Sequence, residues 1–212
     1  MALPKLQIAL DNNSIISSIK TLKQVGDVVD ILEVGTILCL AEGSASIATV
    51  RALFPDKIIL ADTKCADAGK TVAENCRKAG ANWMTVICCA TIETMIAARD
   101  QVEDLQVELY GDWTFEQAKS WKENNINQVV YHQSRDALLS GKTWSEEDLN
   151  KIGKLIDMGF KVSVTGGLEI ETVKLFKDLK VHAFIAGRGI RDAQDPKQAA
   201  IEFKQEIEKV FS

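Results

Sequence analysis

The stretch KIILADTKCADAG, residues 57–69, joins an apolar run to three charged residues, Asp62, Lys64 and Asp67. A short run of this kind favours a strand that is buried on both faces, as in parallel sheets. Charged residues that follow such a strand are costly to bury unless they are paired, hydrogen-bonded or bound to a ligand. The stretch therefore has two interpretations: a solvated loop with an incidental ion pair, or the edge of a functional site.

Similar apolar runs recur along the chain and predict seven further strands. These runs are LQIAL (6–10), VVDILEV (28–34), WMTVICC (83–89), LQVELY (105–110), NQVVYH (127–132), KVSVT (161–165) and HAFIAG (182–187). The segments between them show helical spacing, as at Ile47, Val50 and Phe54. Eight strand–helix units in 212 residues fit a compact barrel better than an open doubly wound sheet, which has about five or six strands. We therefore predict an α/β fold with one catalytic domain, a single (β/α)8 TIM barrel spanning residues 1–212.

The composition limits the classes of partner. A formal charge of -5 and a pI near 5.2 provide no basic stripe for nucleic acid or an anionic membrane. No apolar run approaches the roughly 18 residues of a membrane span, and MALPKLQIALD lacks the pattern of a secretory signal. The five cysteines are odd in number and show no C-x-x-C spacing, so we expect reduced thiols. We predict a cytoplasmic protein with a small-molecule ligand and with neither nucleic acid nor membrane as a partner.

A barrel of this type collects function at the carboxyl ends of its strands and in the loops that follow them. Seven of the eight predicted strands end in, or run into, residues of a functional type. These residues are Asp11, Glu33, Asp62 with Lys64, Glu108, His132 with Arg135, Thr165 in TGG (165–167), and Arg188 in GRGIR (187–191). Because barrel strands are buried on both faces, polar residues at these positions predict a site.

The last two of these loops are typical of an anion-binding site. Gly166, Gly167 and Gly187 would let backbone N–H groups approach an anion, and Arg188 offers a forked cation. In barrels, the loops after strands seven and eight frequently build a phosphate site. The competing interpretation is that the glycines only end strands and cap helices. Their position in the predicted fold favours phosphate.

Two carboxylates at neighbouring strand ends, Glu33 and Asp62, have no histidine or cysteine beside them. Such a hard oxygen site suits Mg²⁺, which keeps several waters and takes further ligands from its substrate. Asp62 and Lys64 are two residues apart on a predicted strand and therefore share a face. An ammonium beside a dication favours chemistry that develops negative charge, such as formation of an enediolate. The alternative is a structural Asp62–Lys64 ion pair.

The chain has only two histidines, and the barrel places them at opposite ends. His132 ends the sixth predicted strand, where a group that titrates near neutrality can act as a general acid. Arg135 follows one short loop later, where it could hold an ordered water or share in proton delivery. His182 begins the eighth strand, at the stabilising end of the barrel, and is predicted to be structural.

The motif in ADTKCADAG resembles the D-x-K-x-x-D motif of the orotidine monophosphate decarboxylase suprafamily. Together with ALD, EVGT, VELYGDW, VVYHQSRD, VTGG and IAGRGIRD, it resembles the 3-keto-L-gulonate 6-phosphate decarboxylase family along essentially the whole chain. The resemblance implies Mg²⁺-dependent decarboxylation of 3-keto-L-gulonate 6-phosphate to L-xylulose 5-phosphate. The implied reaction passes through a cis-enediolate and belongs to L-ascorbate utilisation.

The resemblance also implies a homodimer with shared sites and a role for each motif residue. Glu33 and Asp62 would ligate the metal, Lys64 would stabilise the enediolate, and Asp67 would complete the site across the dimer interface. Asp11 and Glu108 would orient the substrate and Lys64, and His132 and Arg135 would serve reprotonation. The substrate would be bound by Thr165, Gly167, Gly187 and Arg188, the last three of which would contact its phosphate. Gln133 stands where a basic residue is expected.

Two alternatives remain. Hexulose 6-phosphate synthase, an aldolase that joins formaldehyde to ribulose 5-phosphate, shares the barrel, the metal and the D-x-K-x-x-D motif, but YHQSRD with Arg135 resembles the decarboxylase. A noncatalytic sugar-phosphate sensor would keep only the phosphate loops. A sensor has no need of a metal and a proton donor together, so the set Glu33, Asp62, Lys64 and His132 weighs against it.

Overall fold

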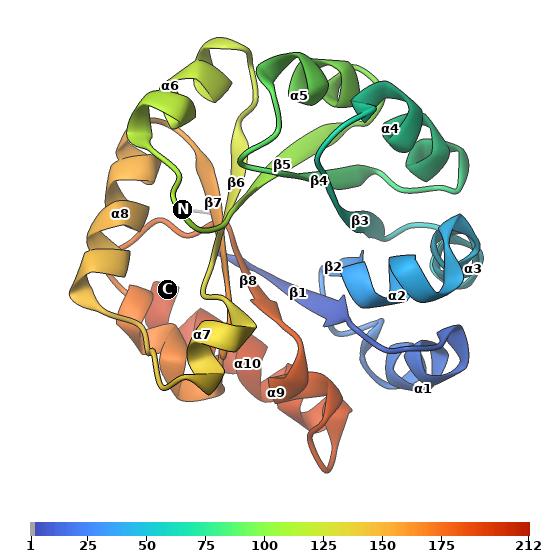
Figure 1. Cartoon of the computed structure of the whole chain (residues 1–212). Helices are drawn as coiled ribbons and strands as arrows, with labels where there is room; N and C mark the ends of the chain where they lie inside the picture. The colour runs from blue at the N-terminus through green and yellow to red at the C-terminus, as the bar shows by residue number, and fades with distance from the viewer. Residues whose placement is uncertain (1–2) are drawn as a thin grey trace.

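Eight parallel strands close into a barrel in the computed structural model, which describes residues 3–212 (Figure 1). The strands are β1 (Lys5–Leu10), β2 (Ile31–Val34), β3 (Ile58–Cys65), β4 (Trp83–Ile87), β5 (Asp104–Leu109), β6 (Gln128–His132), β7 (Lys161–Thr165) and β8 (Ala183–Ala186). Each strand pairs with its neighbours in sequence, and β8 pairs with β1. The predicted (β/α)8 TIM barrel is confirmed, and every predicted strand is found close to its predicted position.

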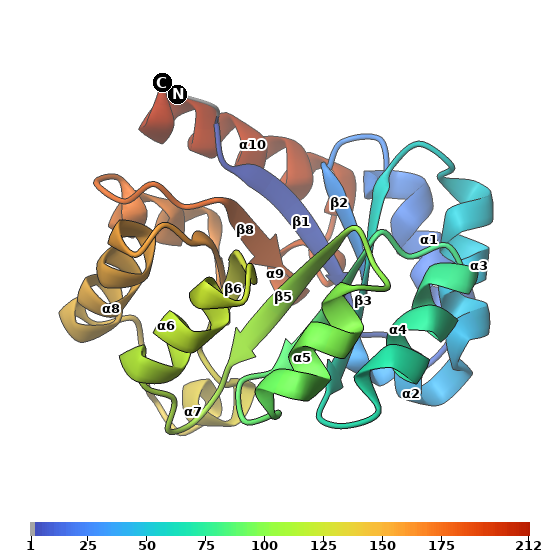
Figure 2. The same cartoon turned by 90° about the horizontal axis from the view of Figure 1, so that it is seen from above.

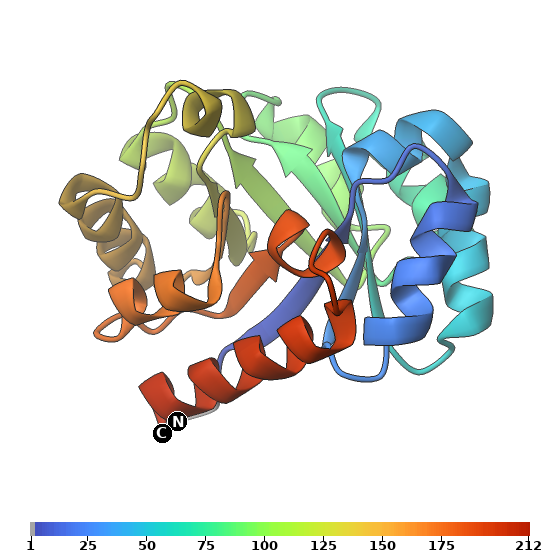
Figure 3. The same ribbon diagram turned by 90° about the horizontal axis from the view of Figure 1, so that it is seen from below.

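Helical segments connect the strands and surround them (Figure 1). They are α1 (Ile15–Val25), α2 (Thr36–Glu42), α3 (Ser44–Leu53), α4 (Gly69–Lys78), α5 (Ile92–Arg99), α6 (Phe115–Glu123), α7 (Arg135–Leu139), α8 (Glu146–Asp157), the 3₁₀ helix η1 (Ile170–Phe176), α9 (Arg188–Arg191) and α10 (Pro196–Phe211). Side-chain caps begin several of them; the Ser14 hydroxyl, for example, accepts from the Ser17 N–H at 3.3 Å. The last helix, α10, lies near the first described residues, because Lys204, Ile207 and Glu208 line a surface pocket together with Leu3, Pro4 and Lys5 (Figures 2 and 3).

The main apolar core lies between the outer face of the barrel and the helices. Phe176, Phe184 and Phe203 are fully buried there, and the rings of Phe176 and Phe184 are 5.5 Å apart. Two small apolar clusters lie apart from it; one joins Ala9, Val130 and Ile185, and the other joins Ile31, Leu60 and Trp83. Strand residues therefore alternate between the two sides of the barrel wall, as parallel barrels require.

The strand β3 is longer than its apolar run predicts and continues to Cys65, so that Asp62 and Lys64 lie within the strand. The solvated-loop interpretation of this stretch is therefore wrong. The ladder to β4 shifts register between Ala61 and Cys65, and Lys64 has a φ of +44°. A positive φ is uncommon for a residue with a side chain, and bulges of this kind redirect side chains beside functional sites.

Among residues 3–212, no single helix is long and apolar enough to cross a membrane. The pair α2 and α3 reaches the required length and composition only when the two are joined across a bend of 109°.

His182 lies immediately before β8, at the amino-terminal end of the barrel, as predicted. Its ring is 6.3 Å from that of Trp83, and its buried Nε2 has no hydrogen-bond partner in the described part of the chain. Burial, together with the positive charges of Lys161 and Lys5, lowers the pKa of His182 to about 4. The side chain is therefore neutral near pH 7 and serves the packing of this end of the barrel.

We expect His182 to make the folded state less stable as the pH falls from about 6.5 to about 4. In the unfolded chain the imidazole takes up a proton near its ordinary pKa of about 6.5, whereas the folded side chain resists protonation until about pH 4. Compared with His182→Gln, the wild type should lose free energy of unfolding across this window. Urea denaturation of both proteins at several pH values measures the difference; a difference that does not change with pH contradicts the assignment.

Candidate active site

A cavity of about 350 Å³ opens at the carboxyl ends of the strands, and every strand contributes to its lining. Every predicted site residue except Asp67 lines it: Asp11, Glu33, Asp62, Lys64, Glu108, His132, Arg135, Thr165, Gly167, Gly187 and Arg188. These residues come from strands and loops far apart in sequence, so the barrel closure brings them together.

Lys64 lies at the centre of the charged residues. Its Nζ is 2.6 Å from Asp62 Oδ2 and 3.0 Å from Glu108 Oε2, and it donates to Thr36 Oγ1 at 2.8 Å. Burial alone would lower the pKa of Lys64, but the charges of Asp62 and Glu108 outweigh it and raise that pKa above its ordinary value. The side chain is therefore a permanent ammonium near neutral pH.

Asp62 is buried, and both of its carboxylate oxygens accept hydrogen bonds. Thr85 donates to Oδ1 at 2.7 Å, and Thr36 donates to Oδ2 at 2.6 Å. Burial would raise the pKa of Asp62, but the neighbouring Lys64 and the two hydroxyl donors lower it below its ordinary value. Asp62 is therefore an ionised carboxylate whose position is held by Thr85 of β4 and by Thr36, the first residue of α2.

Glu33 is the last but one residue of the neighbouring strand β2, and its Oε2 accepts a hydrogen bond from Gln7 Nε2 at 2.5 Å. Burial, and then the charges of Asp62 and Asp11, raise the pKa of Glu33 well above its usual range. A positive ion between these carboxylates would offset that repulsion, so the donor set fits a hard cation. Within residues 3–212 no group of three or more histidine, cysteine or acidic side chains is arranged as a complete metal site. Glu33 and Asp62 can supply two ligands, which leaves the other positions to substrate and water.

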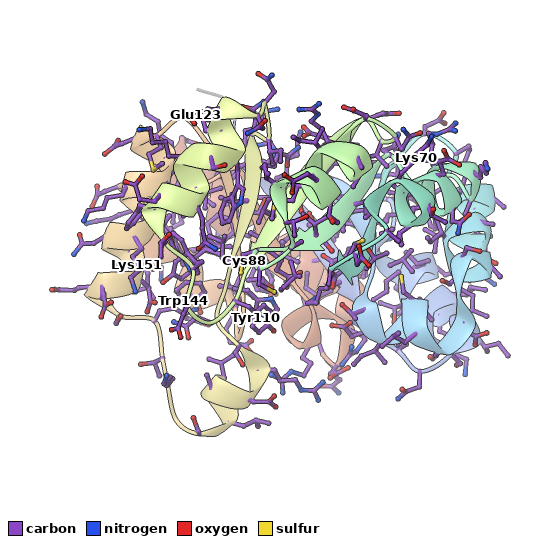
Figure 4. The ribbon with its side chains drawn as sticks, turned by 45° about the horizontal axis from the view of Figure 1, so that its top comes forward. Lys70, Cys88, Tyr110, Glu123, Trp144 and Lys151 are labelled. Atoms are coloured by element: carbon purple, nitrogen blue, oxygen red, sulfur yellow. The ribbon has the colours of Figure 1, made fainter. Side chains whose placement is uncertain are left out.

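Both nitrogens of the His132 ring have a partner. Nδ1 is 2.5 Å from Glu108 Oε1, and Nε2 is 3.3 Å from the hydroxyl of Tyr110, whose ring lies 4.7 Å from the imidazole. Glu108 thus bridges Lys64 and His132 through its two oxygens. Burial and the charge of Asp62 raise the pKa of Glu108 despite these partners. Tyr110 lies toward the end of the molecule that carries α7, opposite Glu123 (Figure 4).

The loops after β7 and β8 form the other side of the cavity. Gly166 has a φ of +106°, and a Cβ there would lie 2.2 Å from the carbonyl oxygen of Gln133, so the position requires glycine. The hydroxyl of Thr165 donates to the Ile185 carbonyl at 3.1 Å and ties the two strands together. Arg188 lines this side of the cavity, and Arg191, which the sequence analysis did not single out, lines it as well.

Asp67 is the one predicted site residue that does not line the cavity of its own chain. It is exposed and lies in the loop between β3 and α4, two residues before the helix begins at Gly69. Asp67 therefore takes no part in the cavity of its own chain.

Sequence reasoning missed four residues that hold the predicted ones: Gln7, Thr36, Thr85 and Tyr110. Thr85 had a detectable signal, because it is a polar residue in the middle of a predicted buried strand.

Gln133, where a basic residue was expected, lines the cavity, but its amide donates to Asp148 Oδ2 at 2.9 Å. Tyr131 donates to the other oxygen of Asp148 at 2.7 Å, and Trp144 donates to the Gly166 carbonyl at 3.1 Å. These contacts anchor the segment that follows β6, which carries Arg135. Trp144, at the far end of this segment, is labelled in Figure 4.

We expect Thr85→Val to loosen the end of β3. The Thr85 hydroxyl donates to Asp62 and accepts from the Lys64 N–H at 2.9 Å, and valine keeps the shape but leaves both groups without this partner. The loss should lower the free energy of unfolding by about 1–3 kcal/mol and speed hydrogen exchange at the Lys64 amide. Thr21→Val, on the buried side of α1, is the matched control. Unchanged exchange at Lys64 in Thr85→Val would show that this contact does not hold the bulge.

The chain resembles known proteins over its whole length. A family model described as Orotidine 5'-phosphate decarboxylase / HUMPS family matches residues 4–203. The 3-keto-L-gulonate-6-phosphate decarboxylase UlaD from Escherichia coli is 51% identical over 215 residues that cover all of both chains. A crystal structure of KGPDC from Streptococcus mutans, in complex with a sugar phosphate, has a TM-score of 0.98 and 55% identity, again over all of both chains. A structure of 3-hexulose-6-phosphate synthase from Salmonella typhimurium has a TM-score of 0.91 and 26% identity, covering 97% of this chain and 99% of the other. The chain therefore belongs to the orotidine 5'-phosphate decarboxylase / HUMPS family.

Proposed function

We propose that this chain is a decarboxylase that converts 3-keto-L-gulonate 6-phosphate to L-xylulose 5-phosphate and CO₂, with Mg²⁺ as its cofactor. The observation that carries the proposal is the Lys64 ammonium, held 2.6 Å from Asp62 and 3.0 Å from Glu108 in the cavity that Glu33 also lines. The Escherichia coli relative named for this decarboxylation matches the entire chain and supports the choice of substrate.

The chemistry follows from the substrate. Its ketone is β to the carboxylate, so the electron pair of the broken C–C bond moves onto the carbonyl oxygen as CO₂ leaves and forms a cis-enediolate. The ammonium of Lys64 is already in place before this charge develops, so it stabilises the enediolate without further reorganisation. Fixed electrostatic groups of this kind contribute on the order of several kcal/mol to lowering the barrier.

Glu33 and Asp62 are the residues that would hold the metal. A bound Mg²⁺ would supply positive charge at the substrate oxygens on which the negative charge collects. The hydrogen bonds from Thr85 and Thr36 keep Asp62 ionised and oriented, and the hydrogen bond from Gln7 orients one oxygen of Glu33.

His132 is proposed to deliver the proton to the carbon that has lost CO₂. Glu108 and Tyr110 hold the two ring nitrogens, so the imidazole keeps one orientation at the cavity wall. Arg135 lines the same wall and is proposed to assist, whereas the side-chain amide of Gln133 is engaged with Asp148.

The phosphate of the substrate is proposed to bind between the loops after β7 and β8. Gly167 and Gly187 offer backbone amides there, Arg188 offers a guanidinium, and Thr165 lines the adjoining wall. The crystal structure of the Streptococcus mutans relative holds a sugar phosphate, which supports this ligand class. Asp11, which follows the adjoining strand β1, is proposed to orient the sugar.

A place in L-ascorbate utilisation and a cytoplasmic location follow from the proposed reaction and are part of the proposal. The second candidate is hexulose 6-phosphate synthase activity, which is favoured by the structural similarity to the Salmonella typhimurium synthase. Both activities would use the same enediolate-stabilising groups. A sensor without catalysis would leave the Lys64, Asp62 and Glu108 contacts without a purpose.

The proposed reaction and its metal requirement can be measured directly. With 3-keto-L-gulonate 6-phosphate and Mg²⁺ the protein should release CO₂ and form L-xylulose 5-phosphate faster than it joins formaldehyde to ribulose 5-phosphate. Exhaustive EDTA treatment should abolish the activity, and added Mg²⁺ should restore it. Asp62→Asn should lower the rate by orders of magnitude because it removes a charged ligand. Asp56→Asn, in the exposed turn before β3, is the control. Full turnover after EDTA treatment would rule out the metal role.

We further propose that the protein is a homodimer in which Asp67 of one subunit completes the site of the other. The exposed position of Asp67, outside the cavity of its own chain, supports this arrangement. A two-fold dimer would place the same loop of each subunit against its partner, so that both sites would be completed at once.

Mixing two variants tests the shared site. Lys64→Ala and Asp67→Asn should each be inactive alone, but a hybrid dimer contains one complete site, with Lys64 from one chain and Asp67 from the other. Random subunit exchange should therefore restore about a quarter of the wild-type activity. Native mass spectrometry would confirm that hybrids have formed. An inactive mixture that contains hybrids would place Asp67 in the site of its own chain.

A further inference from the structure

The barrel interior beneath the cavity is polar. The strand registers put Gln7 of β1, Leu60 of β3, Gln106 of β5 and Ser163 of β7 in one layer, built by alternate strands as in other barrels. All four side chains are fully buried and none of them lines the cavity, whereas Glu33, one layer higher, does. This layer therefore forms the floor beneath the site.

Three atoms of this layer have no hydrogen-bond partner within residues 3–212: Gln7 Oε1, Gln106 Oε1 and Ser163 Oγ. Buried polar atoms are rarely left unpaired, because they have given up their hydrogen bonds to water. Three of them converging on one barrel layer therefore indicate a partner that is not a side chain.

The orientation of both glutamine amides is determined by carboxylates. Gln7 Nε2 donates to Glu33, while Gln106 Nε2 donates at 2.9 Å to Gln128 Oε1, and Gln128 donates to Asp104. A carboxylate accepts hydrogen bonds only from a donor, so Glu33 fixes the NH₂ group of Gln7, and Asp104 fixes the NH₂ group of Gln128. The carbonyl of Gln128 then accepts from the NH₂ group of Gln106. The Oε1 atoms of Gln7 and Gln106 are therefore left without a partner.

The three free atoms cannot satisfy one another. Two are pure acceptors, and the Ser163 hydroxyl has a single proton, so at least one acceptor would stay unpaired. One water molecule satisfies all three, because it donates to Gln7 Oε1 and Gln106 Oε1 and accepts from Ser163. Buried waters typically make about three such bonds.

We propose that one ordered water molecule occupies this layer, bound by Gln7, Gln106 and Ser163, and that it holds Gln7 as a positioning residue for Glu33. The positioning role of Gln7 rests on the proposed function, in which Glu33 is a metal ligand. Gln7 engages Oε2 of Glu33, which leaves Oε1 without a hydrogen bond from the described residues. The water thus supports, through one glutamine, the carboxylate that would face the metal.

A high-resolution crystal structure of the full chain tests the water directly. We expect an ordered density peak within hydrogen-bond distance of Gln7 Oε1, Gln106 Oε1 and Ser163 Oγ. A direct hydrogen bond from Ser163 to either glutamine, with no such peak, would overturn the water site. An amide of Gln7 turned away from Glu33 would overturn the positioning role.

Metal titration of the protein without substrate tests the positioning role. Mn²⁺, followed by its electron paramagnetic resonance signal, stands in for Mg²⁺. Gln7→Met should weaken Mn²⁺ binding about 10- to 100-fold, as the loss of a carboxylate-orienting partner does at other metal sites. Gln106→Met removes an equivalent amide and one partner of the water but keeps the direct bond from Gln7 to Glu33, so it should weaken Mn²⁺ binding less than Gln7→Met does. Thermal unfolding would show that each variant is folded, and Gln7→Asn, too short to reach Glu33, replaces Gln7→Met if that variant does not fold.

The control variant Glu33→Ala separates the two proposals. If Glu33→Ala loses Mn²⁺ binding while Gln7→Met and Gln7→Asn bind like the wild type, Glu33 is a ligand and the positioning role of Gln7 is wrong. If Glu33→Ala binds Mn²⁺ as well as the wild type, the ligand role proposed for Glu33 fails, and the positioning role fails with it. The crystal structure decides the water site in either case.

Discussion

One ammonium between two buried carboxylates, Lys64 between Asp62 and Glu108, is the interaction on which the rest of the site depends. The two carboxylates lie on β3 and β5, with β4 between them, so the lysine ties separate strands together across the barrel mouth. Burying the two carboxylates would cost much free energy without the Lys64 ammonium as their counter-ion. The bulge at the end of β3 gives Lys64 its unusual backbone conformation and aims it at both partners. Removing Lys64 would leave two buried carboxylates without their counter-ion, and removing either carboxylate would take one partner away from Lys64.

The charge of the cavity wall is unevenly distributed. Asp11, Glu33 and Asp62 lie on the side formed by β1 to β3, while Arg135, Arg188 and Arg191 follow β6 and β8. Glu33 shows the consequence, because burial and its acidic neighbours raise its pKa well above the usual range. The acidic side suits a cation, and the basic side suits an anion. A sugar phosphate that lies across the cavity can therefore place its phosphate toward β7 and β8 and its reacting end toward Glu33 and Asp62, which is the orientation that the proposed reaction needs.

The sequence by itself determined the barrel and most of the residues of its mouth. Buried parallel strands need apolar runs of limited length, and these runs recur with helical segments between them, so the strands could be located without a structure. Because the barrel places function at the carboxyl ends of strands, each polar residue there became a candidate. Glu33, Asp62, Glu108 and His132 were found in this way, since each is a polar residue at the end of an apolar run, and the structure brings them into one cavity.

Only the tertiary structure decided how these residues are held. The hydrogen bonds of Thr85 to Asp62, Gln7 to Glu33 and Tyr110 to His132 join strands or loops whose separation in sequence is more than twenty residues. The register of the strands and the shear of the barrel determine which inward-facing residues share a layer of the barrel interior. Neither the register nor the shear can be derived from local sequence patterns. The bulge that aims Lys64 has the same origin, because it depends on how β3 pairs with β4. Local patterns determine which residues are buried, whereas contacts between distant strands determine which of them meet.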